Sequence, residues 1–141
     1  MQGSIQRFEL ASAAWLGERG VVRRKLQMYL PPSYLTAAER RYPVLYMHYG
    51  QHIFAPNYSG HETWKVHETV ERLLADGLIE EVIIVGIVAA RETINADFWH
   101  YESLYDWQVL GGAAYEHFIV DELKPWVDQN FRTLADREHS A

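Results

Sequence analysis

Histidines are the side chains of this sequence whose spacing first suggests chemistry, because two pairs stand close enough to share a metal ion. His48 and His52 lie four residues apart, and His61 lies near His67. A closed zinc site needs four ligands, and Gly50 interrupts the helical geometry that would bring His48 and His52 onto one face. We therefore interpret the histidines as loop residues that bond to backbone or water, and we expect no metal and no cofactor.

Serines and carboxylates are the other candidates for catalysis. A serine nucleophile needs a sharp strand-to-helix turn with glycine on both sides and a histidine base within reach. The candidates are Ser33, Ser59, Ser103 and Ser140, and none of them has such a setting. Glu62, Glu68 and Glu71 fall mostly on the solvated side of an amphipathic segment, which is not the facing pair that glycosidic chemistry uses. The absence of cysteine excludes a thiol nucleophile and a thiolate zinc site.

Length and charge restrict the remaining classes. The 141 residues suit one domain, residues 1–141. Thirteen basic against nineteen acidic side chains give a net charge of −6, which disfavours nucleic acid as a partner. The longest apolar run, 82–90, is about half of the ~20 residues that span a bilayer, so no membrane partner is expected. The N-terminus lacks the apolar segment of a secretory signal, which indicates a cytoplasmic protein, with a secreted precursor as the alternative.

The elements that would position these residues alternate between strands and helices. Apolar and β-branched runs predict strands over 21–30, 44–48 and 82–88. A helix is expected between the last two, beginning at the possible capping box Ser59 to Glu62 and ending at Gly77. A second helix follows 111–112, and Pro125 should kink or restart it. The pattern predicts an α/β fold with a mostly parallel sheet and flanking helices.

An ordered set of segments resembles the esterase branch of the α/β-hydrolases, which contains enterochelin esterases, S-formylglutathione hydrolases and feruloyl or acetyl-xylan esterases. The segments are 28–34, 41–51, 82–87, 118–128 and 131–134, so the resemblance covers roughly residues 20 to 141. It implies the N-terminal half of an α/β-hydrolase three-layer sandwich, and it implies ester hydrolysis by a serine in a G-x-S-x-G turn. This sequence contains no such motif.

In relatives, a stretch like 137–141 runs directly into the strand that carries the nucleophile. The resemblance therefore suggests an esterase half that lacks the nucleophile, the acid and the base, and that is inactive alone. What it would retain is the loop after the third sheet strand, where a backbone N–H stabilises the oxyanion. By resemblance, Gln51 is the candidate donor, Gly50 allows close approach, and Tyr49 stands where relatives usually have aspartate.

Aromatic and histidine side chains would border the substrate in such an enzyme. The binding residues that the resemblance suggests are His48, His52, Trp64, Trp99, Tyr101 and Trp107. The aromatic segment 98–107 has two other interpretations, which are packing over the sheet and an exposed interface.

The last expectation concerns partners. In complete relatives the strand 44–48 lies between the strand 82–88 and the nucleophile strand. Without the nucleophile strand one apolar sheet edge would be open, and open edges pair with other chains. We therefore expect either a homo-oligomer formed through this edge or association with a complementary C-terminal half. The alternative function is a non-catalytic association module that uses the edge and segment 98–107.

Overall fold

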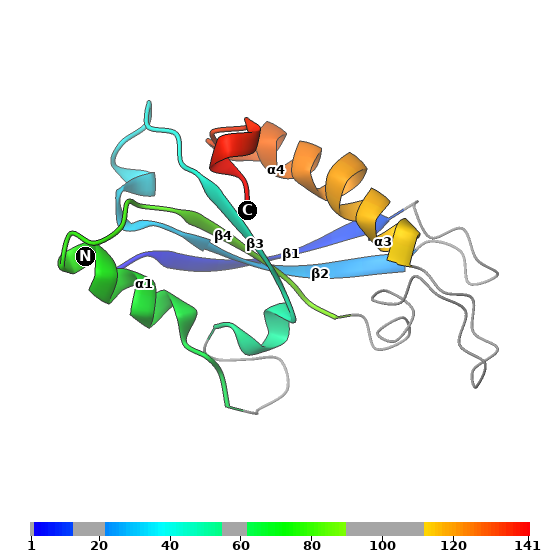
Figure 1. Cartoon of the computed structure of the whole chain (residues 1–141), viewed down its shortest axis with the longest axis horizontal. Helices are drawn as coiled ribbons and strands as arrows, with labels where there is room; N and C mark the ends of the chain where they lie inside the picture. The colour runs from blue at the N-terminus through cyan, green and yellow to red at the C-terminus, as the bar shows by residue number, and fades with distance from the viewer. Residues whose placement is uncertain (1, 13–21, 55–61, 90–111) are drawn as a thin grey trace.

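Four strands form one mixed sheet in the computed structural model, which describes residues 2–12, 22–54, 62–89 and 112–141 (Figure 1). The strands are β1 (Ser4–Ser12), β2 (Val22–Leu30), β3 (Val44–His48) and β4 (Ile83–Ile87), and their order is β1-β2-β4-β3. β2 is antiparallel to both β1 and β4, whereas β3 is parallel to β4. The parallel pair is the one joined through a helix, as a parallel connection requires.

Helices cover both faces of the sheet. α1 (Val66–Ala75) lies on one face, and α3 (Gly112–His117), η3 (Phe118–Leu123) and α4 (Lys124–Asn130) follow one another along the other (Figure 1). Three short 3-10 helices, η1 (Pro32–Leu35), η2 (Gly50–His52) and η4 (Arg137–His139), lie in the connections. The layered α/β class is confirmed, while two of the three strand pairs described are antiparallel. Among the described residues, no helix is long and apolar enough to cross a membrane.

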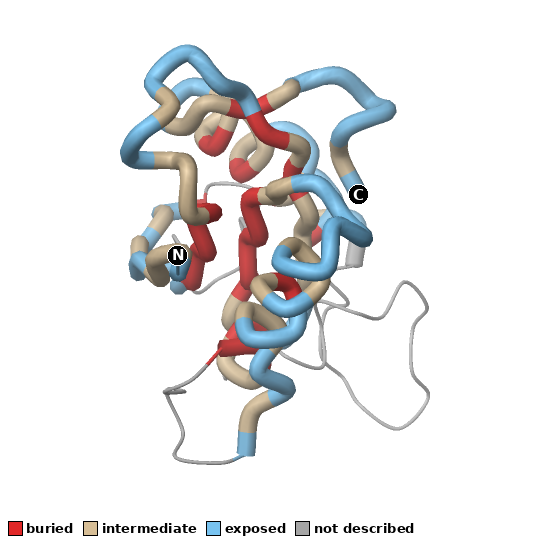
Figure 2. Tube along the Cα trace, turned by 90° about the vertical axis from the view of Figure 1, so that its left-hand side faces the viewer, coloured by how far each residue is buried: buried red, intermediate tan, exposed pale blue. Residues whose placement is uncertain are grey.

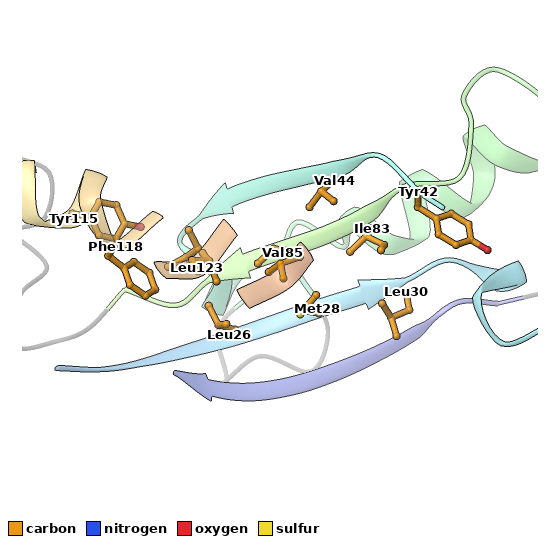
Figure 3. Close-up of a cluster of buried hydrophobic side chains, with 12 residues drawn as sticks. Leu26, Met28, Leu30, Tyr42, Val44, Ile83, Val85, Tyr115, Phe118 and Leu123 are labelled. Atoms are coloured by element: carbon orange, nitrogen blue, oxygen red, sulfur yellow. The ribbon is translucent and has the colours of Figure 1, made fainter. Parts of the chain in front are cut away.

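The two faces of the sheet bury separate apolar clusters. Because side chains alternate along a strand, Leu26, Met28 and Leu30 of β2 face α3, η3 and α4, while Tyr29 faces α1. The larger cluster adds β3 and β4 side chains and the helical Phe118, as Figure 3 shows. Burial is concentrated along the strands and the inner sides of the helices (Figure 2). The sheet is thus a layer covered on both sides, which fixes the register of every strand.

Strand β1 is the element that the sequence analysis missed. It pairs with β2 over its full length, from Ser4 opposite Leu30 to Ser12 opposite Val22. Phe8 packs against the larger cluster, where its ring lies 5.4 Å from the ring of Trp126. The signal was weak because the polar side chains of β1 interrupt the alternation of apolar residues, so this strand depends on its pairing with β2.

The expected start of the first helix was wrong. Glu62 is not helical, Ser59 lies outside the described residues, and α1 begins at Val66. The backbone N–H groups of Trp64 and Val66 donate to the carbonyls of His52 and Ile53, at 2.8 and 2.9 Å. These tertiary hydrogen bonds keep the backbone up to residue 64 in a non-helical conformation. The expected stop at residue 77 is confirmed, because Gly77 has a φ of +68° just after the helix.

The hydrogen-bonding pattern of the second helix changes just before Pro125, where the sequence predicted a kink or a restart. The π-helical segment η3 ends at Leu123, and α4 then begins with Pro125 in its first turn. A residue in the first turn has no intrahelical acceptor for its N–H, so proline is tolerated there. The π segment therefore removes the hydrogen bond that Pro125 could not make.

The outer edge of β3 is partly covered by the end of the chain. Val44 forms a parallel bridge with Ser140. The N–H of Tyr46 donates to the carbonyl of Ala141 at 2.6 Å, and the N–H of Ala141 donates to the carbonyl of Val44 at 3.1 Å. Residues 140–141 thus pair with the outer side of β3 as the start of a fifth strand position, parallel to β3. Beyond Tyr46, no other segment of the described chain pairs with this edge.

Asp136 holds the turn that leads into this pairing. Its carboxylate accepts hydrogen bonds from the N–H of Glu138 at 3.0 Å and from Nδ1 of His139 at 2.7 Å. The hydrogen bond with His139 is the main reason that the pKa of Asp136 lies below its usual value of 3.8. Because the folded-state pKa is depressed, the contribution of the carboxylate is present above pH 3.8 and is lost as the pH falls through the lower folded value.

We expect the substitution Asp136→Ala to loosen the edge pairing, because it removes the side-chain cap of η4. Hydrogen exchange of the Tyr46 amide, which donates to Ala141, should accelerate by about threefold to tenfold. Asp136→Asn keeps a capping oxygen and is the matched control, with an exchange rate near that of the wild type. Equal Tyr46 exchange in the wild type and the alanine variant would show that the cap does not support the pairing.

Candidate active site

The loop after β3 turns sharply onto the face of the sheet that α1 covers. Tyr49 has φ 55° and ψ 44°, in the left-handed region, and the 3-10 turn η2 follows it directly. A non-glycine residue in this region costs about 1 kcal/mol. Because β3 and β4 are parallel, their carboxyl ends both lie beside this loop. Ligands of open α/β sheets bind at the carboxyl ends of the strands.

Two glycines let the loop lie directly against the sheet. A Cβ atom placed on Gly50 would stand 2.5 Å from the carbonyl carbon of Gly86 and 2.6 Å from its oxygen. A Cβ atom on Gly86 would stand 2.4 Å from Cδ1 of Ile53 and 3.2 Å from the Cα of Gly50. The η2 turn therefore contacts the backbone of β4 where neither residue has a side chain. Gly86, in the middle of a β-branched strand, was a sequence signal for this close approach.

Gln51 is fixed by its side chain, and its backbone N–H is not used within the η2 turn. Its Oε1 accepts a hydrogen bond from the N–H of Ala89 at 3.0 Å, which ties the loop to the residues just beyond β4. As a residue at the start of η2, Gln51 has a backbone N–H that no carbonyl of this turn accepts. The sequence predicted Gln51, Gly50 and Tyr49 as the oxyanion loop, and the structure places all three in one turn. Their role in catalysis stays a prediction.

His48 points to the opposite face of the sheet from η2. Its Nδ1 lies 3.0 Å from the hydroxyl oxygen of Tyr115 in α3, and the two rings are 5.6 Å apart. The buried Arg24 guanidinium lies over the Tyr115 ring, 5.2 Å from its centre. His48, the last residue of β3, therefore contacts α3. This contact was not predicted from the sequence.

Tyr49, His52 and Trp64 form the aromatic border of the loop. The rings of Tyr49 and His52 are stacked with centres 6.5 Å apart, and the Trp64 backbone is bonded to His52. Trp64 is 64% exposed and Tyr49 is 39% exposed, so both offer apolar surface beside η2. The other predicted binding residues, Trp99, Tyr101 and Trp107, lie outside the described residues, as does the whole segment 98–107.

The titratable groups near the loop do not form a catalytic pair within the described chain. Burial, and secondarily the charge of Asp128, raises the pKa of Tyr46 well above its usual value, so this phenol stays protonated even in alkaline solution. No group of three or more histidine, aspartate or glutamate side chains converges on a metal-binding geometry among the described residues. What the described loop offers chemically is a backbone donor, with aromatic surface beside it.

Comparison with known proteins identifies relatives. A family model described as "Putative esterase" matches residues 21–141. The endo-1,4-beta-xylanase/feruloyl esterase of Xylanibacter ruminicola is 30% identical over 122 residues, which are 81% of this chain and 15% of that protein. The structure superposes on a ferulic acid esterase at 27% identity, with a TM-score of 0.68, covering 100% of this chain and 49% of that one.

A more distant solved structure shares the fold. It is a ferulic acid esterase from Anaeromyces mucronatus, at 18% identity and a TM-score of 0.66, and the match covers 100% of this chain and 48% of that one. The chain thus spans about half the length of these solved structures. The shared half includes the sheet strands and the loop after β3.

The contact between Gly50 and Gly86 generates a stability prediction. Gly50→Ala should lower the free energy of unfolding by about 2 to 3 kcal/mol, because the new methyl group meets the backbone of β4, which cannot move aside as a side chain can. Gly77→Ala is the comparison variant, since its Cβ would meet nothing within 4 Å and only the left-handed strain of about 1 kcal/mol applies. Urea unfolding measures both. A Gly50→Ala cost at or below that of Gly77→Ala would contradict the close packing.

Proposed function

The chain belongs to the esterase family, and on this premise we propose that it carries the oxyanion-loop half of the active site of a serine-type carboxylic-ester hydrolase. The observation that supports the proposal is the parallel register between Val44 and Ser140, followed by the hydrogen bond from Tyr46 to Ala141. A strand that continued this ladder would run beside Tyr46 and His48 and would end next to η2. The residue at its end would then face the backbone N–H of Gln51.

The proposed division of labour follows from the chemistry of ester hydrolysis. A serine at the end of the added strand, whose proton passes to a histidine of the second half, attacks the ester carbonyl, and the resulting oxyanion oxygen accepts a hydrogen bond from the N–H of Gln51. When the carbonyl re-forms, the bond to the alcohol breaks and the alcohol takes the proton from the histidine; water then releases the acid from the serine by the same route. A second N–H comes from the residue after the serine. The chain of residues 1–141, as a single partial domain, supplies the first donor but no covalent step. We therefore expect little or no turnover from the chain alone.

The aromatic border supports an ester with an aromatic group as the substrate class. Trp64 and Tyr49 expose ring surface beside η2, and ring-on-ring contact orients a flat aryl group. Two of the relatives are named as feruloyl or ferulic acid esterases, which agrees with this choice. His52 would contribute to this border, whereas His48, which the resemblance also suggested, points to the opposite face of the sheet and contacts Tyr115. The proposal requires no cofactor.

A chimera tests the proposal directly. Residues 1–141 are fused to the C-terminal part of the 27% identical ferulic acid esterase, beginning after the residue that superposes on Ala141. The chimera should hydrolyse an aryl ester such as p-nitrophenyl acetate with saturation, because the serine strand completes the site. In this chimera Gln51→Pro removes the proposed donor at a helical position that tolerates proline, and kcat should fall by about 10²- to 10³-fold.

The controls separate folding from chemistry. Gln51→Ala keeps the backbone N–H and should retain most of the turnover, although it loses the hydrogen bond to Ala89. Replacement of the donor half's nucleophilic serine by alanine should abolish turnover. The proposal fails if a chimera that unfolds cooperatively has no activity. It also fails if Gln51→Pro turns over as fast as Gln51→Ala.

A second candidate function is association without catalysis. The observation that favours it is the outer edge of β3, along which Ser140 and Ala141 add a short parallel stretch beside Val44 and Tyr46. An open strand edge offers N–H and C=O groups to another strand. The partner would be a second copy of this chain or a complementary half, and a segment such as 98–107 would enlarge the surface.

Sedimentation tests the association. At micromolar concentration the chain should form dimers or larger species, because each copy offers the same edge. A monodisperse monomer of the unmodified chain would contradict this function and leave the half-site proposal intact.

A further inference from the structure

Strand β1 gives the described sheet a long and regular edge. In the strand order β1-β2-β4-β3, β1 lies at the edge opposite β3 (Figure 3). Its nine residues pair with β2 in one continuous register, from Ser4 opposite Leu30 to Ser12 opposite Val22, so no bulge interrupts the strand. The strand also contains no proline and no glycine. Bulges and prolines are devices that prevent an edge strand from pairing with another chain, and β1 lacks both.

The two faces of β1 carry different side chains. Phe8 packs against the larger apolar cluster, on the side of the sheet that α3, η3 and α4 cover. Because side chains alternate along a strand, Arg7 and Glu9 lie on the other face, the α1 side, where both are exposed. Their opposite charges thus stand two residues apart, on either side of Phe8, which is the middle residue of the strand.

A second copy of this chain is the partner that fits this pattern. Two edge strands related by a two-fold axis perpendicular to the sheet pair in antiparallel orientation, and residues that stand opposite each other share a face. With the axis at Phe8, Ser4 stands opposite Ser12 of the second copy, and all nine residues of β1 are paired. In the same register, Arg7 of each copy stands opposite Glu9 of the other. Two pairs of opposite charge therefore form across the contact.

The charges disfavour the neighbouring two-fold registers. An axis at Arg7 would place the two copies of Arg7 opposite each other, and an axis at Glu9 would do the same for Glu9. Like charges directly opposite each other destabilise a pair of strands, whereas opposite charges stabilise it. The register that pairs the whole strand is therefore also the register that the charges favour.

Contacts already present in the chain are compatible with this pairing. Oε1 of Glu9 accepts a hydrogen bond from Arg23 at 2.9 Å, and both side chains are exposed. A carboxylate accepts through both oxygens, so Oε2 can accept from Arg7 of the second copy. On the other face, the Phe8 ring lies 5.4 Å from Trp126 and 5.5 Å from Phe131, and all three rings are only partly buried. Phe8 of the second copy would stand at the centre of the contact and add its ring to this group.

We propose that β1 is a self-association edge: two copies of the chain pair through β1, antiparallel, about a two-fold axis at Phe8, with Arg7 of each copy paired with Glu9 of the other. The two four-stranded sheets then form one continuous sheet. The proposal goes beyond the proposed function and does not depend on it. Because β3 lies at the opposite edge, the dimer does not use the edge where a second half of the site would join.

Sedimentation of Arg7→Glu tests the charge pairing. The substitution turns both cross-copy contacts into pairs of like charge, so the dissociation constant of the dimer should rise about tenfold or more. Arg72→Glu makes the same change at an exposed position of α1 and should leave the dissociation constant unchanged. A wild-type chain that is monomeric at micromolar concentration would overturn the proposal. A dimer that Arg7→Glu leaves equally strong would also overturn it, and would direct attention to another surface such as the β3 edge.

Cysteine cross-linking tests the register, because the chain has no cysteine of its own. Arg7→Cys and Glu9→Cys are prepared separately and then mixed under mild oxidation. In the proposed register, position 7 of one copy stands opposite position 9 of the other, at a Cα distance of about 5 Å that a disulfide can span. The mixture should therefore give a covalent dimer that contains both variants, which its mass identifies.

Each variant alone is the control for this cross-link. Its two thiols would stand two residues out of line across the strand pair, more than about 7 Å apart between Cα atoms, which is too far for a disulfide. Little covalent dimer should form. A mixture that gives no mixed dimer, or a single variant that cross-links as well as the mixture, would overturn the register. This measurement decides the proposal even if Arg7→Glu does not fold.

Discussion

The contact between Gly50 and Gly86 is the constraint on which the candidate site depends. With a side chain at either position, the turn after β3 could not lie on the backbone of β4. The same contact sets where Gln51 stands and lets its side chain reach Ala89. The geometry of a possible catalytic loop is thus determined by two absent Cβ atoms.

The sheet gives this contact a rigid support. Apolar clusters on both faces hold β2, β3 and β4 in one register, and a shift of one residue would move every buried side chain to the wrong face. The outer edge of β3 then presents a fixed ladder, on which residues 140–141 have begun to pair. Under the proposed function, this partial ladder is the place where the second half of the site would join.

The sequence predicted the parts of the fold that have strong local patterns. The strands at β2, β3 and β4, the helix stop at Gly77 and the register change near Pro125 all follow from apolar periodicity or from backbone restrictions of glycine and proline. The start of α1 could not be predicted, since hydrogen bonds from a distant turn decide it. Strand β1 was missed because pairing, rather than its own pattern, stabilises it.

The site was predictable only in part for the same reason. The loop Tyr49, Gly50 and Gln51 follows from a family resemblance, whereas the contacts that hold it, with Gly86 and Ala89, come from a segment far away in sequence.

The central claim is that the backbone N–H of Gln51 stabilises the oxyanion of an ester hydrolysis completed by a second half. The most direct test is a crystal structure of the completed enzyme with a phosphonate bound covalently to its serine, since the phosphonyl oxygen takes the place of the oxyanion. The account predicts a distance of about 2.7 to 3.1 Å from the Gln51 nitrogen to that oxygen. A phosphonyl oxygen directed away from the 49–52 loop, with other donors around it, would contradict the account.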